Sequence, residues 1–219
     1  IKLVGYYDDE FPDSLRKTVD EEGKLNPPLL LWYRGDLSIT KLPGIAVIGT
    51  IEPTDEGIIG GKYLAGEFAK RGFNIVSGLE VGCDTCGHQG ALEAGGKTTA
   101  ILANGLDGKS IYPPENRELA ENIVNRGGLL LSEYPINTSV NRYSLVARDR
   151  LQSGLAQATL VIQTGKVGGT MHAAKATMEA NKPLYVMLFK NEETNKQEKC
   201  LGNEILHEQG AIYIKGNDN

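Results

Sequence analysis

Two short apolar runs, each followed by a turn of small residues and then by a helical pattern, constrain the fold of this chain most. The runs and their turns are 45–48 with Gly49 and Thr50, and 74–76 with Ser77 and Gly78. Glycines let a backbone approach an anion closely, and the N–H groups at the start of the following helix attract negative charge. The two units therefore predict strands that lead into helices, and a ligand that carries phosphates.

From residue 44 onward, apolar runs alternate with helical patterns, which favours a doubly wound, mostly parallel sheet with helices on both faces. Predicted strands are 45–48, 74–77, 99–103, 129–132, 160–163, 184–187 and 211–214, and predicted helices lie around 64–69, 116–126, 143–156, 170–181 and 204–208. Residues 1–43 predict a small lead-in, with a polar helix around 14–22 and one strand that packs on the main body. The expected organisation is this lead-in and one domain over 44–219, with 191–199 as a solvated loop.

Charge and cysteine content narrow the class of protein. The 219 residues carry a net charge of -5, which argues against a protein that coats duplex DNA through bulk positive charge but leaves room for a local basic groove. The cysteines are odd in number, and no apolar run is long enough to cross a membrane. We therefore expect a cytoplasmic protein without a membrane partner.

Small polar residues gather at the predicted carboxyl ends of the strands, where open sheets of this kind bind ligands. They are Gly49, Thr50, Ser77, Gly78, Asn104, Gly105, Ser132, Glu133 and the segment 164–170. Each group alone is more typical of an ordinary turn. Five such turns at one edge of a sheet indicate a binding site.

Five motifs in a fixed order carry a family resemblance: SGLEVGCDTCGHQGAL, AILANGLDGKSIYPPENREL, GGLLLSEYP, ARDRL and VGGTMHAA. With them the chain resembles the DNA-processing protein A family, also called DprA or Smf, whose Rossmann-like domain is related to the nucleotide-binding Lonely Guy (SLOG) group. The resemblance implies a Rossmann-like fold and a cytoplasmic homodimer that binds single-stranded DNA and passes the strand to a recombinase. It implies neither catalysis nor a cofactor.

Two positions depart from the family pattern in their charge. The turn after the first strand usually reads G-T-R in the family, with the arginine on a DNA phosphate, whereas this chain has Ile51 followed by Glu52. Glu80 replaces a small residue in the first of the five motifs, and its carboxylate fits either beside the phosphate pocket or on a ribose hydroxyl. Both departures weaken the expected attraction for a DNA strand.

Asp84 and His88 keep the family's spacing of four residues, which places them on one helix face where the acid can orient the imidazole. Cys83 and Cys86 beside them suggest zinc, but zinc usually needs four ligands, and no second ligand pair is evident in the sequence. The sequence therefore favours structural thiols and an oriented histidine, with no metal.

The best cationic candidates are Arg148 and Arg150 in the fourth motif, with Lys166 just before the fifth. Residues two apart on a helix do not share a face, so one arginine is expected to hold a phosphate while the other anchors the helix. Tyr112 in the second motif has two interpretations of equal weight. Its ring stacks on a base, or it shapes a turn with Pro113.

The fifth motif places Gly168, Gly169, Thr170 and His172 in a loop before a helix, similar to a family loop that reads G-S-L-x-T-A. It also resembles the Lonely Guy loop P-G-G-x-G-T-x-x-E, whose glutamate serves N-glycosidic cleavage and has no counterpart here, so hydrolase activity is not favoured. Two functions stay open. One is binding of single-stranded DNA; the other is binding of a compact nucleotide signal, such as a cyclic nucleotide or an ADP-ribose derivative, by a sensor or sponge.

Overall fold

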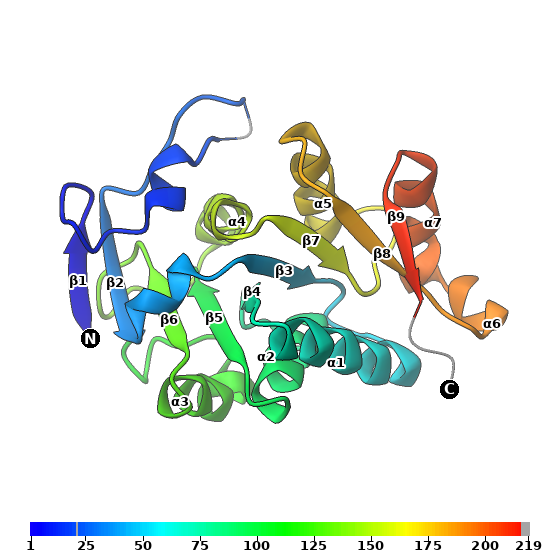
Figure 1. Ribbon diagram of the computed structural model, residues 1–219, viewed down its shortest axis with the longest axis horizontal. Coiled ribbons are helices and arrows are strands. Elements are labelled where there is room, and N and C mark those ends of the chain that lie inside the picture. The colour runs from blue at the N-terminus through cyan, green and yellow to red at the C-terminus, as the bar shows by residue number, and fades with distance from the viewer. Residues whose placement is uncertain (21, 216–219) are drawn as a thin grey trace.

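The computed structural model describes residues 1–20 and 22–215, which form one nine-stranded sheet between two layers of helices (Figure 1). The strand order is β1-β2-β6-β5-β4-β3-β7-β8-β9. The strands are β1 (Lys2–Gly5), β2 (Leu30–Gly35), β3 (Gly44–Ile48), β4 (Asn74–Ser77), β5 (Lys97–Leu102), β6 (Leu129–Ser132), β7 (Ala158–Val161), β8 (Leu184–Leu188) and β9 (Ile212–Lys215). The predicted doubly wound, mostly parallel fold is confirmed.

Helices cover both faces of the sheet, with α1, α2 and α3 on one side and α4, α5 and α7 on the other (Figure 1). The helices are α1 (Asp55–Lys70), α2 (Cys83–Glu93), α3 (Arg117–Asn125), α4 (Arg142–Leu155), α5 (Gly169–Glu179), α6 (Glu192–Asn195) and α7 (Leu201–Glu208), with 3-10 helices η1 (Asp13–Lys17), η2 (Leu37–Lys41), η3 (Pro114–Asn116) and η4 (Glu198–Cys200). None of the helices in the described ranges is long and apolar enough to span a membrane.

The strand order reverses between β3 and β7. The seven strands from β6 to β9 in the sheet order are parallel, while β2 pairs antiparallel with β6 and β1 antiparallel with β2. The parallel part begins at β3, grows through β4, β5 and β6 on one side, and then crosses to β7, β8 and β9 on the other. In open sheets of this kind, the crevice beyond the carboxyl ends at such a reversal is the usual ligand site.

The central strands are buried on both faces, which explains their continuous apolar sequence. In β4, Ile75 packs with Leu64 of α1, whereas Val76 belongs to the cluster on the other side with Leu151 of α4. Both β4 side chains are fully buried. Parallel strands between two helical layers require such uninterrupted apolar runs.

The segment before residue 44 joins the same sheet with two strands, where the sequence predicted one. Strand β2 pairs with β6 from Trp32 to Gly35, and β1 forms the edge. The helix predicted around 14–22 is only the short η1, because beyond it Val19 pairs with Leu25 in an isolated antiparallel bridge. Glu21 lies outside the described residues.

The stretch 191–199, predicted as a solvated loop, folds into α6 and η4. Asn191 caps α6 by accepting from Glu193 N at 3.1 Å. Asn195 then pairs with both backbone groups of Phe189, accepting from its N at 3.0 Å and donating to its O at 2.7 Å. These side-chain amides hold the polar segment against the end of β8.

The helices α1 and α2 pack closely at Gly90, where an added Cβ would overlap the backbone carbonyl of Lys62. We expect Gly90→Ala to lower the free energy of unfolding by about 2 kcal/mol, because the rigid backbone of α1 must move. Gly169→Ala is the control, since no heavy atom lies within 4 Å of its added Cβ, and its change should stay within about 0.5 kcal/mol. Urea unfolding measures both, and equal stability of the two variants would contradict this close packing.

Candidate functional site

The loops after β3 and β7 are joined at the point where the strand order reverses. Thr50 N donates to Gln163 O at 2.8 Å. The buried Gln163 side chain then crosses to the start of α1, where Oε1 accepts from Thr54 N at 2.8 Å and Nε2 donates to Thr54 Oγ1 at 2.9 Å. Nε2 also donates to Cys200 Sγ at 2.9 Å. One glutamine therefore ties the β3 loop, the β7 loop and η4 together.

The glycine turn after β3 is filled by protein atoms. A Cβ on Gly49 would lie 2.5 Å from Cys83 Sγ, so glycine is required here for packing. The start of α2 is also occupied, since Cys83 N donates to Thr50 O at 3.1 Å. Thr54 Oγ1 caps α1 by accepting from Gly57 N at 3.1 Å. The partly exposed Thr50 is what this turn offers to a ligand.

The loop between β7 and α5 is the open part of this edge. Lys166, Gly168, Gly169 and His172 are exposed, and Thr170 is partly exposed. No heavy atom lies within 4 Å of a Cβ placed on either glycine, and Gly168 supplies no side-chain cap to α5. An uncapped helix start leaves N–H groups that an anion can satisfy.

The turn after β4 is closed by the carboxylate of Asp84. Its Oδ2 accepts from Gly78 N at 3.0 Å and from Glu80 N at 3.3 Å. Burial raises the pKa of Asp84 to about 6, although the nearby Arg148 acts in the opposite direction. Burial likewise raises the pKa of Glu80. The Gly78 amide, a predicted phosphate donor, is therefore bonded to a carboxylate of the chain itself.

Arg148 lies inside the protein, with 7% of its surface exposed. Nη1 donates to Ile101 O at 3.0 Å, and Nε donates to Asp149 Oδ1 at 3.2 Å. The Gln152 amide, oriented so that both its ends are satisfied, accepts from Nη1 at 3.1 Å. A Cβ on Gly78 would overlap the guanidinium, so the glycine there makes room for the arginine.

Arg150 anchors α4 to the end of β6 through a two-pronged ion pair with Glu133. Nη1 lies 2.5 Å from Oε2 and Nη2 lies 2.6 Å from Oε1, while Nε donates to Asn26 O at 3.0 Å. The two side chains are 13% and 20% exposed. The structure thus places both Arg148 and Arg150 in internal contacts, and among the three predicted cations Lys166 is the exposed one.

The other predicted polar residues at the strand ends also have internal partners. Ser77 Oγ donates to the backbone of β3 at 2.6 Å. Asn104 Nδ2 donates to Gly105 O at 3.0 Å, and Gly105 N donates to Thr138 O at 2.9 Å. Tyr112 differs, because 43% of its surface is exposed. Stacking of the Tyr112 ring on a base stays a prediction.

His88 is oriented by Thr98, whereas the sequence suggested Asp84. Nδ1 lies 2.7 Å from Thr98 Oγ1, which itself donates to Ile75 O at 2.7 Å. The hydroxyl proton is thus committed, so Nδ1 carries the proton of the imidazole and Nε2 has none. Nε2 is buried without a partner among the described residues. Asp84 cannot serve His88, because its carboxylate turns toward the amides of the β4 turn.

The cysteines are buried single thiols. Burial raises the pKa of Cys86 to about 11, which makes the thiol a poor nucleophile at neutral pH. Within residues 1–20 and 22–215, no three Cys, His, Asp or Glu side chains gather closely enough to hold a metal ion.

Sequence reasoning missed two residues at this edge. Lys199 Nζ, on η4, donates to Glu52 O at 2.7 Å and so brings a cation to the β3 loop. Its surroundings in sequence are uniformly polar and predict only a loop. The sequence predicts Gln163 only as the last residue of the strand 160–163, and no pattern indicates that its side chain joins three segments.

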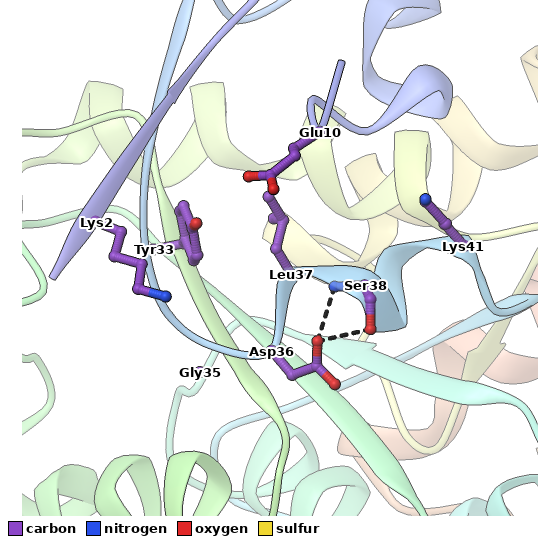
Figure 2. A pocket seen from close by; sticks show the side chains of 8 residues that line it. All are labelled: Lys2, Glu10, Tyr33, Gly35, Asp36, Leu37, Ser38 and Lys41. Atoms are coloured by element: carbon purple, nitrogen blue, oxygen red, sulfur yellow. Dashed lines mark hydrogen bonds between the residues drawn. The ribbon is translucent and has the colours of Figure 1, made fainter. Parts of the chain in front are cut away.

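A cavity of about 280 Å³ lies elsewhere, at the opposite edge of the sheet (Figure 2). Lys2, Glu10, Asp36 and Lys41 are among its lining residues, and Asp36 accepts from Ser38 N and Oγ. The end of β2 that borders it pairs with the beginning of β6. This cavity is therefore not part of the candidate site at the carboxyl ends.

Comparison with known sequences gives relatives named Smf or DNA processing protein DprA. Protein Smf of Synechocystis sp. is 35% identical over 196 residues, which are 88% of this chain and 48% of the relative. The chain thus spans about half the length of this relative. The structure of DNA processing protein A from Streptococcus pneumoniae superposes with a TM-score of 0.85 and 27% identity, covering 97% of this chain and 70% of that one.

A second solved structure is DNA processing protein A from Helicobacter pylori, whose structure addresses a single-stranded DNA binding mode. It has a TM-score of 0.81 and 28% identity, covering 97% of this chain and 91% of that one. The family model for DNA recombination-mediator protein A matches residues 2–219. The chain therefore belongs to the DNA recombination-mediator protein A family, the DprA or Smf proteins.

Proposed function

We propose that this chain binds single-stranded DNA without catalysis, at the carboxyl edge of the sheet between β3 and β7. The observation that carries the proposal is the open β7–α5 loop, where Lys166, Gly168 and Gly169 stand exposed before an uncapped helix. A backbone phosphate fits such a loop because helix N–H groups and a lysine both attract it. The single-stranded DNA binding mode of the Helicobacter pylori relative supports the same ligand class.

Internal contacts of the arginines define how the proposed site works. Arg148 and Arg150 hold the ends of β5 and β6 in place through their internal contacts. The groups that contact phosphate are then Lys166, Thr50, Thr170 and the glycine backbone. Few cations then touch the strand, so binding should weaken with salt less steeply than for a protein with a long basic track. The proposal includes a homodimer in the cytoplasm and a recombinase as partner, as the family resemblance implies.

Binding of labelled oligo-dT, followed by fluorescence anisotropy over a series of salt concentrations, tests this function. We expect binding that weakens as salt rises, and we expect Lys166→Gln to reduce the slope of log K against log salt by about 0.7, the value for one phosphate contact on a single strand. Lys41→Gln, at the cavity on the opposite edge, is the control and should leave the slope unchanged. Absence of oligo-dT binding by the wild type at low salt would refute the proposal.

A second candidate ligand is a compact nucleotide such as a cyclic nucleotide or an ADP-ribose derivative, held by a sensor or sponge. The favouring observation is the carboxylates of Glu80, Asp84 and Asp149 around Arg148, which oppose the approach of a long polyanion. The exposed Tyr112 offers a face for one base. A rise in melting temperature with ADP-ribose, and none with oligo-dT, would favour this candidate.

A further inference from the structure

Lys199 is a cation near the point between β3 and β7 where the strand order reverses. It does not belong to the glycine loops that follow these two strands. It lies on η4, after β8, and its Nζ donates to Glu52 O at 2.7 Å. Lys199 has no ion pair with a carboxylate among the residues that the structure describes. Its hydrogen bond is to a backbone carbonyl, which leaves the full positive charge and two further N–H donors available.

The short helix η4 is fixed against the β7 loop, so the position of Lys199 is defined by several contacts. Gln163 Nε2 donates to Cys200 Sγ at 2.9 Å. Gly202 N donates to Thr164 O at 2.9 Å, and Thr164 N donates to the Asn203 side chain at 2.9 Å. The residue after Cys200 begins α7, and this whole segment is therefore held at the carboxyl end of β7.

The same segment borders the open loop. The backbone O of Glu198 lies 3.6 Å from a Cβ placed on Gly165, the residue before Lys166. The residue before Lys199 thus borders the β7 loop, while the Lys199 side chain reaches the β3 loop at Glu52. The ammonium is therefore bonded to the β3 loop, which also carries Thr50, and η4 borders the β7 loop, which carries Lys166.

We propose that Lys199 is a phosphate-binding residue of this site, which supplies the cation on the β3 side while Lys166 supplies the one on the β7 side. The inference rests on the proposed function and deepens it, since it names a second charged contact for the same ligand. The ligand group is a phosphodiester or phosphate, either in a DNA backbone or in a compact nucleotide. A strand that runs from the β7 loop to the β3 loop meets both lysines.

The variants Lys199→Gln and Lys199→Arg test the proposal. Glutamine keeps a side-chain donor for Glu52 O but removes the charge, whereas arginine keeps both. In oligo-dT anisotropy titrations over several salt concentrations, we expect K199Q to bind more weakly, with the slope of log K against log salt reduced by about 0.7, and K199R to restore the wild-type slope. Lys196→Gln is the matched control, because Lys196 pairs with Glu193 on α6 at 2.9 Å and is 66% exposed.

The outcomes separate this inference from the proposed function. If the wild type binds oligo-dT and K199Q keeps its slope, the role of Lys199 is refuted and the function stands. If the wild type binds ADP-ribose and not oligo-dT, the DNA function fails, and loss of the ADP-ribose melting shift in K199Q supports Lys199 as a phosphate contact, whereas an unchanged shift refutes it. If the wild type binds neither ligand, both proposals are refuted.

Discussion

Arg148→Ala should lower the free energy of unfolding by about 3–5 kcal/mol, the range found when one partner of a buried charge cluster is removed. Ile101 O loses its donor at 3.0 Å, and the buried carboxylate of Asp84 loses the cation that favours its charged form. Gly78 would be left beside a cavity, because its missing Cβ makes room for the guanidinium. Urea unfolding at pH 7, monitored by circular dichroism, measures the change.

Two further variants make the Arg148 result interpretable. Arg148→Lys keeps the positive charge but not the planar guanidinium group. Its free energy of unfolding should therefore lie between those of Arg148→Ala and the wild type. Arg142→Ala changes an exposed arginine at the start of the same helix, and a shift of less than about 0.5 kcal/mol is expected there. If Arg148→Ala is as stable as Arg142→Ala, Arg148 does not hold the β4 and β5 ends together.

His88 should make the protein sensitive to acid. Burial, with a contribution from the positive charge of Arg148, lowers the pKa of His88 from 6.5 to about 3. Below pH 6.5 the unfolded chain therefore binds a proton that the folded protein cannot accept at the unpartnered Nε2. Stability supplied by the neutral imidazole is present above pH 6.5 and is lost as the pH falls toward 3. At pH 4 the loss amounts to about 3 kcal/mol.

Asp84 works in the opposite direction, so the wild type alone cannot reveal this effect. Its folded pKa of about 6 lies above the ordinary 3.8, and its contribution to stability is therefore full below pH 3.8 and lost as the pH rises through 6. Asp84 is present in both the wild type and a His88 variant, so the difference in stability between the two proteins at each pH cancels the Asp84 contribution. His88→Asn keeps a side-chain N–H that can donate to the Thr98 hydroxyl. This variant should be less stable than the wild type at pH 7, and the difference in the free energy of unfolding should shrink by about 3 kcal/mol at pH 4.

The control for His88→Asn is His172→Asn, at an exposed histidine of α5. Because this side chain is exposed, the substitution should change the free energy of unfolding by less than about 0.5 kcal/mol at either pH. A deficit of His88→Asn that stays constant between the two pH values would contradict an imidazole that remains neutral in the folded protein.

The parallel core was predictable because its physical signal is local. A strand buried on both faces, such as 74–77, needs an uninterrupted apolar run, and its neighbours in sequence show where it ends. The edge strand β1 carries a weaker signal. In β1, Leu3 is 52% exposed while Val4 is buried, so the apolar residues do not form a run that distinguishes a strand from an irregular lead-in.

The chemistry of the site was harder to predict, since it depends on residues far apart in sequence. Gly78 and Arg148 are close in space only because α4 packs over the ends of β4 and β5. A motif marks both as functional, yet it cannot show that the arginine fills the space beside the glycine. Lys199 is the converse case, where a cation that no motif marks is brought to the β3 loop because side-chain amides fold a polar segment.

The side chain of Gln163 has a consequence for how fast and how tightly this edge can engage a ligand. Because it fastens the β3 loop, the start of α1 and η4 to one another, these segments need no rearrangement before contact, and little conformational entropy is lost there on binding. The glycine pair ahead of α5 has no such brace. If this edge binds the proposed ligand, we expect the entropic penalty of binding to fall mainly on the backbone torsions of this loop, so that a single stiffening substitution there alters the lifetime of the complex.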